Sequence, residues 1–112
     1  MKRSPIAKVN PARKAKAFAR AYGGAERVRW IQSQPCILCS QSPCENAHVT
    51  GGGAGRKADA RWIVPLCHRC HAELHTIGQK TFEAKYGDLM FWAQVIDARW
   101  EQYLALHPTE TP

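Results

Sequence analysis

The chain has 112 residues, which suits one small domain and leaves little room for a second. It carries a formal net charge of +7 and contains no long apolar run and no signal-peptide core, so we expect a cytoplasmic protein with no membrane association. In that compartment, five cysteines favour metal binding over disulfides.

The positive charge is concentrated at the start of the chain. Residues 1–22 hold seven Lys and Arg and no acidic residue, whereas residues 23–112 hold nine Lys and Arg and nine Asp and Glu. A basic segment beside a near-neutral domain is typical of binding to a polyanion, most simply nucleic acid; the alternative is a solubilising tail. We therefore expect a basic N-terminal arm over residues 1–22 and a folded domain over 23–112.

Two helices are expected in the first third of the chain. Asn10 suits an N-cap and a proline follows it, so the first helix should run over 11–22, where a Gly-Gly pair stops it. A second, shorter helix is predicted over 25–32, with Val28 and Ile31 facing the core.

Two CxxC pairs then frame the middle of the chain. Cys36 and Cys39 form the first pair and Cys67 and Cys70 the second, and four thiolates suit one tetrahedral structural zinc ion. The alternatives are chance spacing or a redox pair. The interval of 27 residues between the pairs exceeds the usual zinc-ribbon gap, so we expect a functional insertion there. Cys44 is expected to be a buried or idle thiol, with exchange for a ligand of the first pair left open.

The insertion supplies a strand, a glycine-rich loop and a return strand. The first strand should cover 45–49 and include His48, and the second should cover 61–66. Between them, four glycines in five positions precede Arg56 and Lys57. The loop lacks the P-loop pattern, and its glycines favour close approach of the backbone to a phosphodiester; the alternative is a plain flexible loop.

A helix is predicted to follow the second CxxC pair. His71 and His75 lie four residues apart, so they share one helix face and both imidazoles can hold a second metal ion. His68 should face away from the cysteines, as a bystander or a phosphate contact. A short helix over 81–86 and an amphipathic helix over 88–106 complete the chain.

This order of elements resembles the HNH endonuclease family, and in particular its small phage and prophage members, which include the recombination-enhancement nucleases. The resemblance implies an α+β fold: a small ββα-metal (HNH, His-Me finger) core over about residues 35–87, with a zinc-bound four-cysteine frame and flanking helices. The residues that carry the resemblance are Cys36-x-x-Cys39, Ala47-His48-Val49, Gly55-Arg56-Lys57, Val64-Pro65-Leu66-Cys67 and Cys70-His71-x-x-x-His75.

The same resemblance implies metal-dependent hydrolysis of DNA phosphodiester bonds by a nuclease domain over 23–112. His48 matches the family's general base, and His71 and His75 match its helix ligands for a catalytic divalent cation, which would be Mg²⁺, Mn²⁺, Ni²⁺ or Zn²⁺. Arg56 and Lys57 would hold the substrate backbone. DNA is the implied partner, together with a recombination protein or a second copy of the chain.

Two departures from the family pattern bear on the metal site. Many members have Asp or His just before the base, where this chain has Ala47. Phage-type members often have an Asp three residues after the Lys, whereas here Asp59 lies two after Lys57 and Ala60 holds the third place. Either His48 is itself a ligand, or Asp59 or substrate oxygens complete the shell. The alternative function is a zinc-finger nucleic-acid-binding module without catalysis, which predicts one zinc ion per chain and binding without cleavage.

Overall fold

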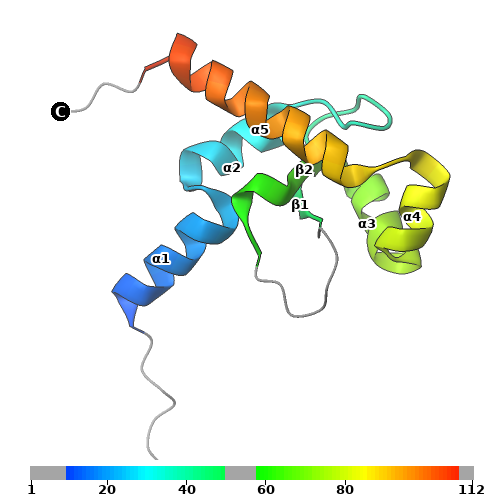
Figure 1. Ribbon diagram of the computed structural model, residues 1–112, viewed down its shortest axis with the longest axis horizontal. Helices are drawn as coiled ribbons and strands as arrows, with labels where there is room; N and C mark the ends of the chain where they lie inside the picture. Colours follow the sequence, from blue (N-terminus) through cyan, green and yellow to red (C-terminus); the bar gives the residue numbers. More distant parts are fainter. Residues whose placement is uncertain (1–9, 50–57, 109–112) are drawn as a thin grey trace, which may run out of the picture.

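The computed structural model describes residues 10–49 and 58–108, and in this part of the chain it is a helix-rich α+β protein with a two-stranded sheet (Figure 1). The α+β class is therefore confirmed. In chain order the elements are α1 (Pro11–Tyr22), α2 (Ala25–Ser33), β1 (Glu45–His48), the 3₁₀ turn η1 (Ala60–Trp62), β2 (Ile63–Leu66), α3 (His68–Ile77), α4 (Gln79–Tyr86) and α5 (Leu89–Leu106).

Helix α1 begins and ends as its capping residues predict. The Oδ1 atom of Asn10 accepts hydrogen bonds from the backbone N–H groups of Ala12 and Arg13, at 3.1 and 3.2 Å. Gly23 ends the helix with φ of 80°, and a Cβ at that position would lie 2.5 Å from the Cδ of Arg27. Glycine is therefore required there both for the backbone angle and for the close approach.

Strands β1 and β2 form an antiparallel hairpin at the centre of the molecule, with His48 opposite Ile63. The second strand is shorter than predicted, because its first two expected residues lie in η1. Asp59 caps that turn by accepting the backbone N–H of Arg61 at 2.8 Å, so the extended conformation begins only at Ile63.

The hairpin separates two cores. Ile63 packs with Ile31 of α2 and Ile96 of α5, whereas Val64 and its strand partner Ala47 lie in a larger cluster with residues of α3, α4 and the start of α5. Successive residues of a strand point to opposite faces, so β2 contributes to both clusters, through Ile63 and Val64. One face of the hairpin is thus an α3 side, and the other is an α1/α2 side.

Helix α5 has the predicted bounds and lies against β2 and η1. Asp88 caps it by accepting the backbone N–H of Met90 at 2.9 Å. The 3–4-residue spacing of its apolar side chains predicts a buried stripe of six residues: Leu89, Trp92, Ala93, Ile96, Trp100 and Leu104. Four of them are buried, while Trp92 and Leu104 are only half-buried. The buried stripe is formed by Leu89, Ala93, Ile96 and Trp100.

No helix among residues 10–49 and 58–108 is both long enough and apolar enough to cross a membrane.

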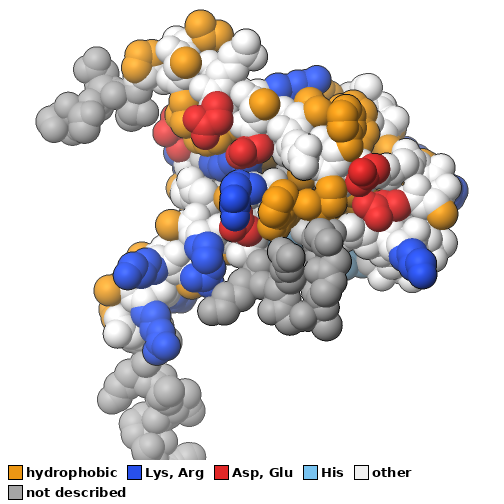
Figure 2. All heavy atoms as spheres, viewed as in Figure 1, with side chains coloured by type: hydrophobic (Ala, Val, Ile, Leu, Met, Phe, Trp, Pro, Cys, Tyr) orange, Lys and Arg blue, Asp and Glu red, His pale blue; other side chains and the backbone are white. Residues whose placement is uncertain are grey.

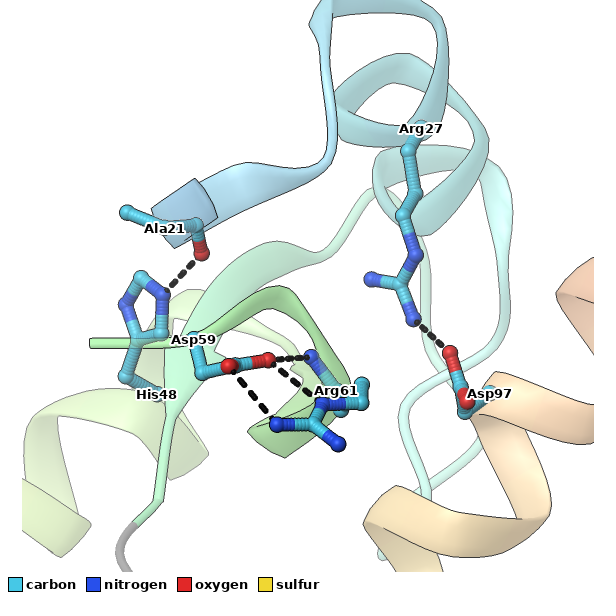
Figure 3. Close-up of polar contacts among 6 residues, drawn as sticks. All are labelled: Ala21, Arg27, His48, Asp59, Arg61 and Asp97. Atoms are coloured by element: carbon cyan, nitrogen blue, oxygen red, sulfur yellow. Dashed lines mark hydrogen bonds and ion pairs between the residues drawn. The ribbon is translucent and has the colours of Figure 1, made fainter. Parts of the chain in front are cut away.

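A buried charge ties α2 to α5. Arg27 is 2% exposed, and its Nη2 donates to Oδ1 of Asp97 at 3.0 Å (Figure 3). Its guanidinium also lies 6.0 Å from the ring centre of Trp100. The sequence pattern did not predict this interaction, because arginine on a short polar helix is normally solvent-exposed.

Candidate functional site

The four predicted cysteine ligands come together at one place. The Sγ atoms of Cys36, Cys39, Cys67 and Cys70 all lie within 4.8 Å of one another, and those of Cys39 and Cys67 are 3.6 Å apart. Zinc bound tetrahedrally at about 2.3 Å needs its sulfur ligands about 3.8 Å apart. The cluster can therefore hold a metal ion such as zinc, with the ligands that the sequence predicts.

Backbone N–H groups support the sulfur atoms of this cluster. Leu38 donates to Sγ of Cys36 at 3.4 Å, and Cys70 donates to Sγ of Cys67 at 3.5 Å. The backbone N–H of Cys70 is the main cause that lowers the pKa of the Cys67 thiol. Donors of this kind favour the thiolate over the thiol, and the thiolate is the form that binds metal.

The fifth cysteine, Cys44, lies outside the group of four. It is 3% exposed, and its thiol donates to the backbone carbonyl of Gln41 at 3.3 Å. Burial, followed by the charge of nearby Cys36, raises the pKa of Cys44 to about 12. Because Cys44 stands outside the four converging sulfurs and its thiol is bound to a carbonyl, the expectation of a buried, idle side chain agrees with its surroundings.

His71 and His75 face each other on α3. Their Nε2 atoms are 3.1 Å apart. Two nitrogens that share one metal ion at about 2.0–2.1 Å lie about 2.9–3.4 Å apart. The predicted pair is therefore spaced to supply two ligands to one cation.

Glu45, at the start of β1, orients this pair. Its Oε1 lies 2.7 Å from Nδ1 of His71, and its Oε2 lies 2.9 Å from Nδ1 of His68. These hydrogen bonds, from His68 first and then His71, hold the pKa of Glu45 below its usual range. A carboxylate only accepts, so His71 carries its proton on Nδ1 and presents the lone pair of Nε2 towards His75. Metal-ligating histidines are commonly held by a carboxylate in this way.

Sequence reasoning missed Glu45 and gave His68 no partner. The signal was weak, because Glu45 is separated from His71 by 26 residues and meets it only when β1 lies beside α3. His68 is exposed, as expected, yet it shares the carboxylate of Glu45 with His71. His68 is therefore joined to the histidine pair through the carboxylate of Glu45.

His48 lies on the other side of the hairpin. Its Nε2 is 2.6 Å from the carbonyl oxygen of Ala21, in the last turn of α1 (Figure 3). A carbonyl only accepts, so Nε2 carries the proton and Nδ1 of the neutral ring keeps a lone pair. Strand alternation places Glu45 on the α3 side and His48 on the α1/α2 side. Among the described residues, the converging ligand group is the four cysteines, and His48 does not form a second group with His71 and His75.

The other predicted site residues are placed as follows. Both carboxylate oxygens of Asp59 bind Arg61, at 3.0 Å from its Nε and 3.1 Å from its Nη2 (Figure 3). These contacts are the main cause that lowers the pKa of Asp59. In this arrangement Asp59 caps η1 and is not grouped with the histidines as a ligand. Arg56 and Lys57 lie outside the described residues.

Comparisons with known proteins describe the chain's relatives without assigning a function to them. No solved structure is significantly similar to it. The uncharacterized protein YdfU of Escherichia coli (strain K12) is 42% identical over 63 residues, which cover 54% of this chain and 18% of that protein. The chain thus matches less than a fifth of the length of this relative. The sequence model of DUF968, described as a protein of unknown function, matches residues 13–101, and the chain therefore belongs to the DUF968 family.

Proposed function

We propose that the protein is a metal-dependent endonuclease of the HNH class, which hydrolyses DNA phosphodiester bonds. The observation that carries the proposal is the His71–His75 pair, with its Nε2 atoms 3.1 Å apart and Glu45 bound to Nδ1 of His71. The pair lies on a helix that directly follows a two-stranded hairpin. Two ligands from one helix leave coordination positions for water and phosphate oxygens, as a catalytic site requires.

His71 and His75 would hold a divalent cation, which would stabilise negative charge on the scissile phosphate and the leaving oxygen. Imidazole nitrogen is a good ligand for Zn²⁺ and Ni²⁺, whereas Mg²⁺ prefers oxygen. Of the four candidate cations, the donor set therefore favours Zn²⁺ or Ni²⁺ over Mg²⁺.

Glu45 is expected to raise the affinity of the His71–His75 pair for the divalent cation. Glu45→Ala would remove the carboxylate that fixes the Nδ1–H form of His71. Loss of such a supporting group typically lowers metal affinity or activity about 10–100-fold. Titration of Ni²⁺ into the zinc-loaded protein, followed by calorimetry, measures the change. Glu83→Ala is the matched control, because that carboxylate bonds to residues of α4 and α5, away from the histidines. Equal Ni²⁺ affinity for both variants and the wild type would exclude the role of Glu45.

His48 would act as the general base from the opposite side of the phosphate. In-line attack places the water and the leaving oxygen on opposite sides of phosphorus. The base nitrogen and the cation then lie on opposite sides of the phosphate and do not share one ligand shell. Glu45, which holds His71, and His48 are three positions apart on β1 and lie on opposite faces of the hairpin. That separation favours the base over the ligand role for His48.

Helix α1 supplies a surface for the DNA backbone. It carries four Lys and Arg and no acidic residue, and these side chains are exposed along the helix, as Figure 2 shows. The four are Arg13, Lys14, Lys16 and Arg20. Arg56 and Lys57 would extend this contact.

Neutralising one face of α1 should weaken DNA binding and its salt dependence. The triple variant Arg13→Gln, Lys16→Gln, Arg20→Gln removes three cations at helical spacing. Counterion release predicts that the slope of log K against log salt becomes shallower by about 0.9 for each phosphate of duplex DNA that is no longer neutralised. Fluorescence anisotropy with a labelled duplex at several salt concentrations measures this slope.

A charge-matched control separates a local interaction from net charge. The variant Arg29→Gln, Lys80→Gln, Arg99→Gln also removes three exposed cations, each from another helix. Its slope should stay closer to that of the wild type. If both triple variants change the slope equally, α1 makes no specific contact with the phosphates.

A second function is a zinc-dependent nucleic-acid-binding module without catalysis. It is favoured by the contrast between the two sites: the cysteine group has four ligands and is largely buried, whereas the histidine pair has two and His75 is exposed. That module would bind one zinc ion per chain and would not cut DNA.

Cleavage of a supercoiled plasmid tests the proposal. The purified, zinc-loaded protein should convert supercoiled DNA to the nicked circle with Mg²⁺, Mn²⁺, Ni²⁺ or Zn²⁺ added singly, and EDTA should stop the reaction. Duplex, single-stranded and branched substrates should be assayed in parallel, with and without a recombinase filament. Binding to these substrates without cleavage under any condition would leave the binding module as the function.

A further inference from the structure

We propose that the last turn of α1 is part of the active site, where it positions His48 to accept a proton through Nδ1; the inference rests on the proposed nuclease function. The carbonyl of Ala21 is one of the terminal helix carbonyls that have no partner within the helix. It lies 2.6 Å from Nε2 of His48, which is 27 residues away in sequence. This hydrogen bond fixes the ring as the Nε2–H tautomer.

Tyr22 holds this arrangement in place. Its ring centre lies 4.8 Å from that of His48, with the rings inclined at 66°, and 5.3 Å from that of Phe18. Tyr22 also packs against the cluster of Ile31, Ile63 and Ile96. The side chain therefore anchors the end of α1 to the core and restricts the imidazole at the same time.

The end of a helix is also an electrostatically suitable place for this interaction. The carbonyl end of α1 carries partial negative charge. When His48 takes a proton from water, its ring becomes positive, and the bond from Nε2–H to Ala21 strengthens. The helix that carries the exposed cations is thus the same helix that orients the base, so the segment expected to be a separable arm contributes to the site.

Variants of Tyr22 in the full-length protein test the positioning role. Tyr22→Ala removes the ring that anchors α1, and Tyr22→Phe retains it. Long-range ¹H–¹⁵N NMR spectra of the zinc-loaded protein, above pH 8, report which nitrogen of His48 is protonated, and the His48→Gln variant assigns the signal. Turnover on a duplex oligonucleotide is measured in parallel to separate kcat from KM.

We expect the Nε2–H tautomer in the wild type and in Tyr22→Phe, with equal kcat. Tyr22→Ala should show a mixture of tautomers and a kcat lower by about tenfold or more. Because α1 also carries the cations proposed to contact DNA, KM should rise as well, and the tautomer mixture is the readout that assigns the loss of kcat to the base. If Tyr22→Ala loses zinc or its helical signal, Ala17→Gly, which weakens α1 without touching His48, replaces it.

The NMR measurement of the tautomer and the measurement of turnover together distinguish failure of this inference from failure of the nuclease function. A wild type with His48 protonated at Nδ1, or a Tyr22→Ala variant that keeps both the Nε2–H tautomer and full kcat, overturns the positioning role while cleavage stands. If the wild type does not cleave DNA, the nuclease function fails and the proposed catalytic role of the turn fails with it. The NMR spectra then show only whether α1 fixes the ring.

Discussion

Replacing Cys36 by serine is expected to release the metal ion and unfold the domain. The side chain is 3% exposed and belongs to the group of four converging sulfurs, which joins the segment after α2 to the start of α3. Structural zinc contributes an apparent binding free energy of about 10–16 kcal/mol to small domains at pH 7. A domain of this size has a net stability of only about 5–15 kcal/mol. Elemental analysis for zinc and thermal unfolding followed by circular dichroism measure the two effects.

Cys44→Ala is the matched control for this variant. Cys44 is equally buried, but its thiol bonds to a backbone carbonyl and stands outside the group of four. We expect it to keep one zinc ion per chain and to lose about 1–2 kcal/mol of unfolding free energy through the small cavity and the missing hydrogen bond. If wild-type protein purifies without metal and Cys36→Ser melts at the same temperature, the cysteines do not form a metal site.

The parts of the fold that sequence predicts well are those with local causes. Asn10 and Gly23 delimit α1, and Asp88 starts α5, because a cap bonds to backbone groups two or three residues away. The CxxC spacing likewise brings each cysteine pair together within a single turn. Such features need no knowledge of which element packs against which.

The features that sequence did not predict depend on tertiary register. Glu45 meets His71 only because β1 lies beside α3, and His48 meets Ala21 only because α1 ends against the opposite face of the hairpin. Glu45 and His48 are three positions apart on β1, an odd number, so strand alternation places their side chains on opposite faces of the hairpin although they are close in sequence. The bonds of Asp59 to Arg61 have a local cause, since the two residues lie two positions apart in sequence, and its role as a metal ligand stays a prediction.

Substitution of the three histidines is expected to abolish cleavage for two different reasons. His71→Ala and His75→Ala each remove one of two facing Nε2 atoms, so divalent metal affinity should fall together with cleavage. His48→Ala removes the proposed base, which should cost about 10²–10⁴-fold in rate while metal affinity and DNA binding persist. Nicking of supercoiled plasmid and calorimetric titration of the cation measure the two effects.

Excess metal and a matched histidine control separate these roles. Raising the cation concentration should partly restore His75→Ala but leave His48→Ala inactive, since a base cannot be replaced by a more fully occupied metal site. His107→Ala should behave as the wild type, because that ring stacks on Tyr103 at the end of α5, away from the hairpin. Rescue of His48→Ala by metal would make His48 a ligand, against its separation from His71 and His75. Full cleavage by both His48→Ala and His75→Ala would show that DNA is not cut at this site.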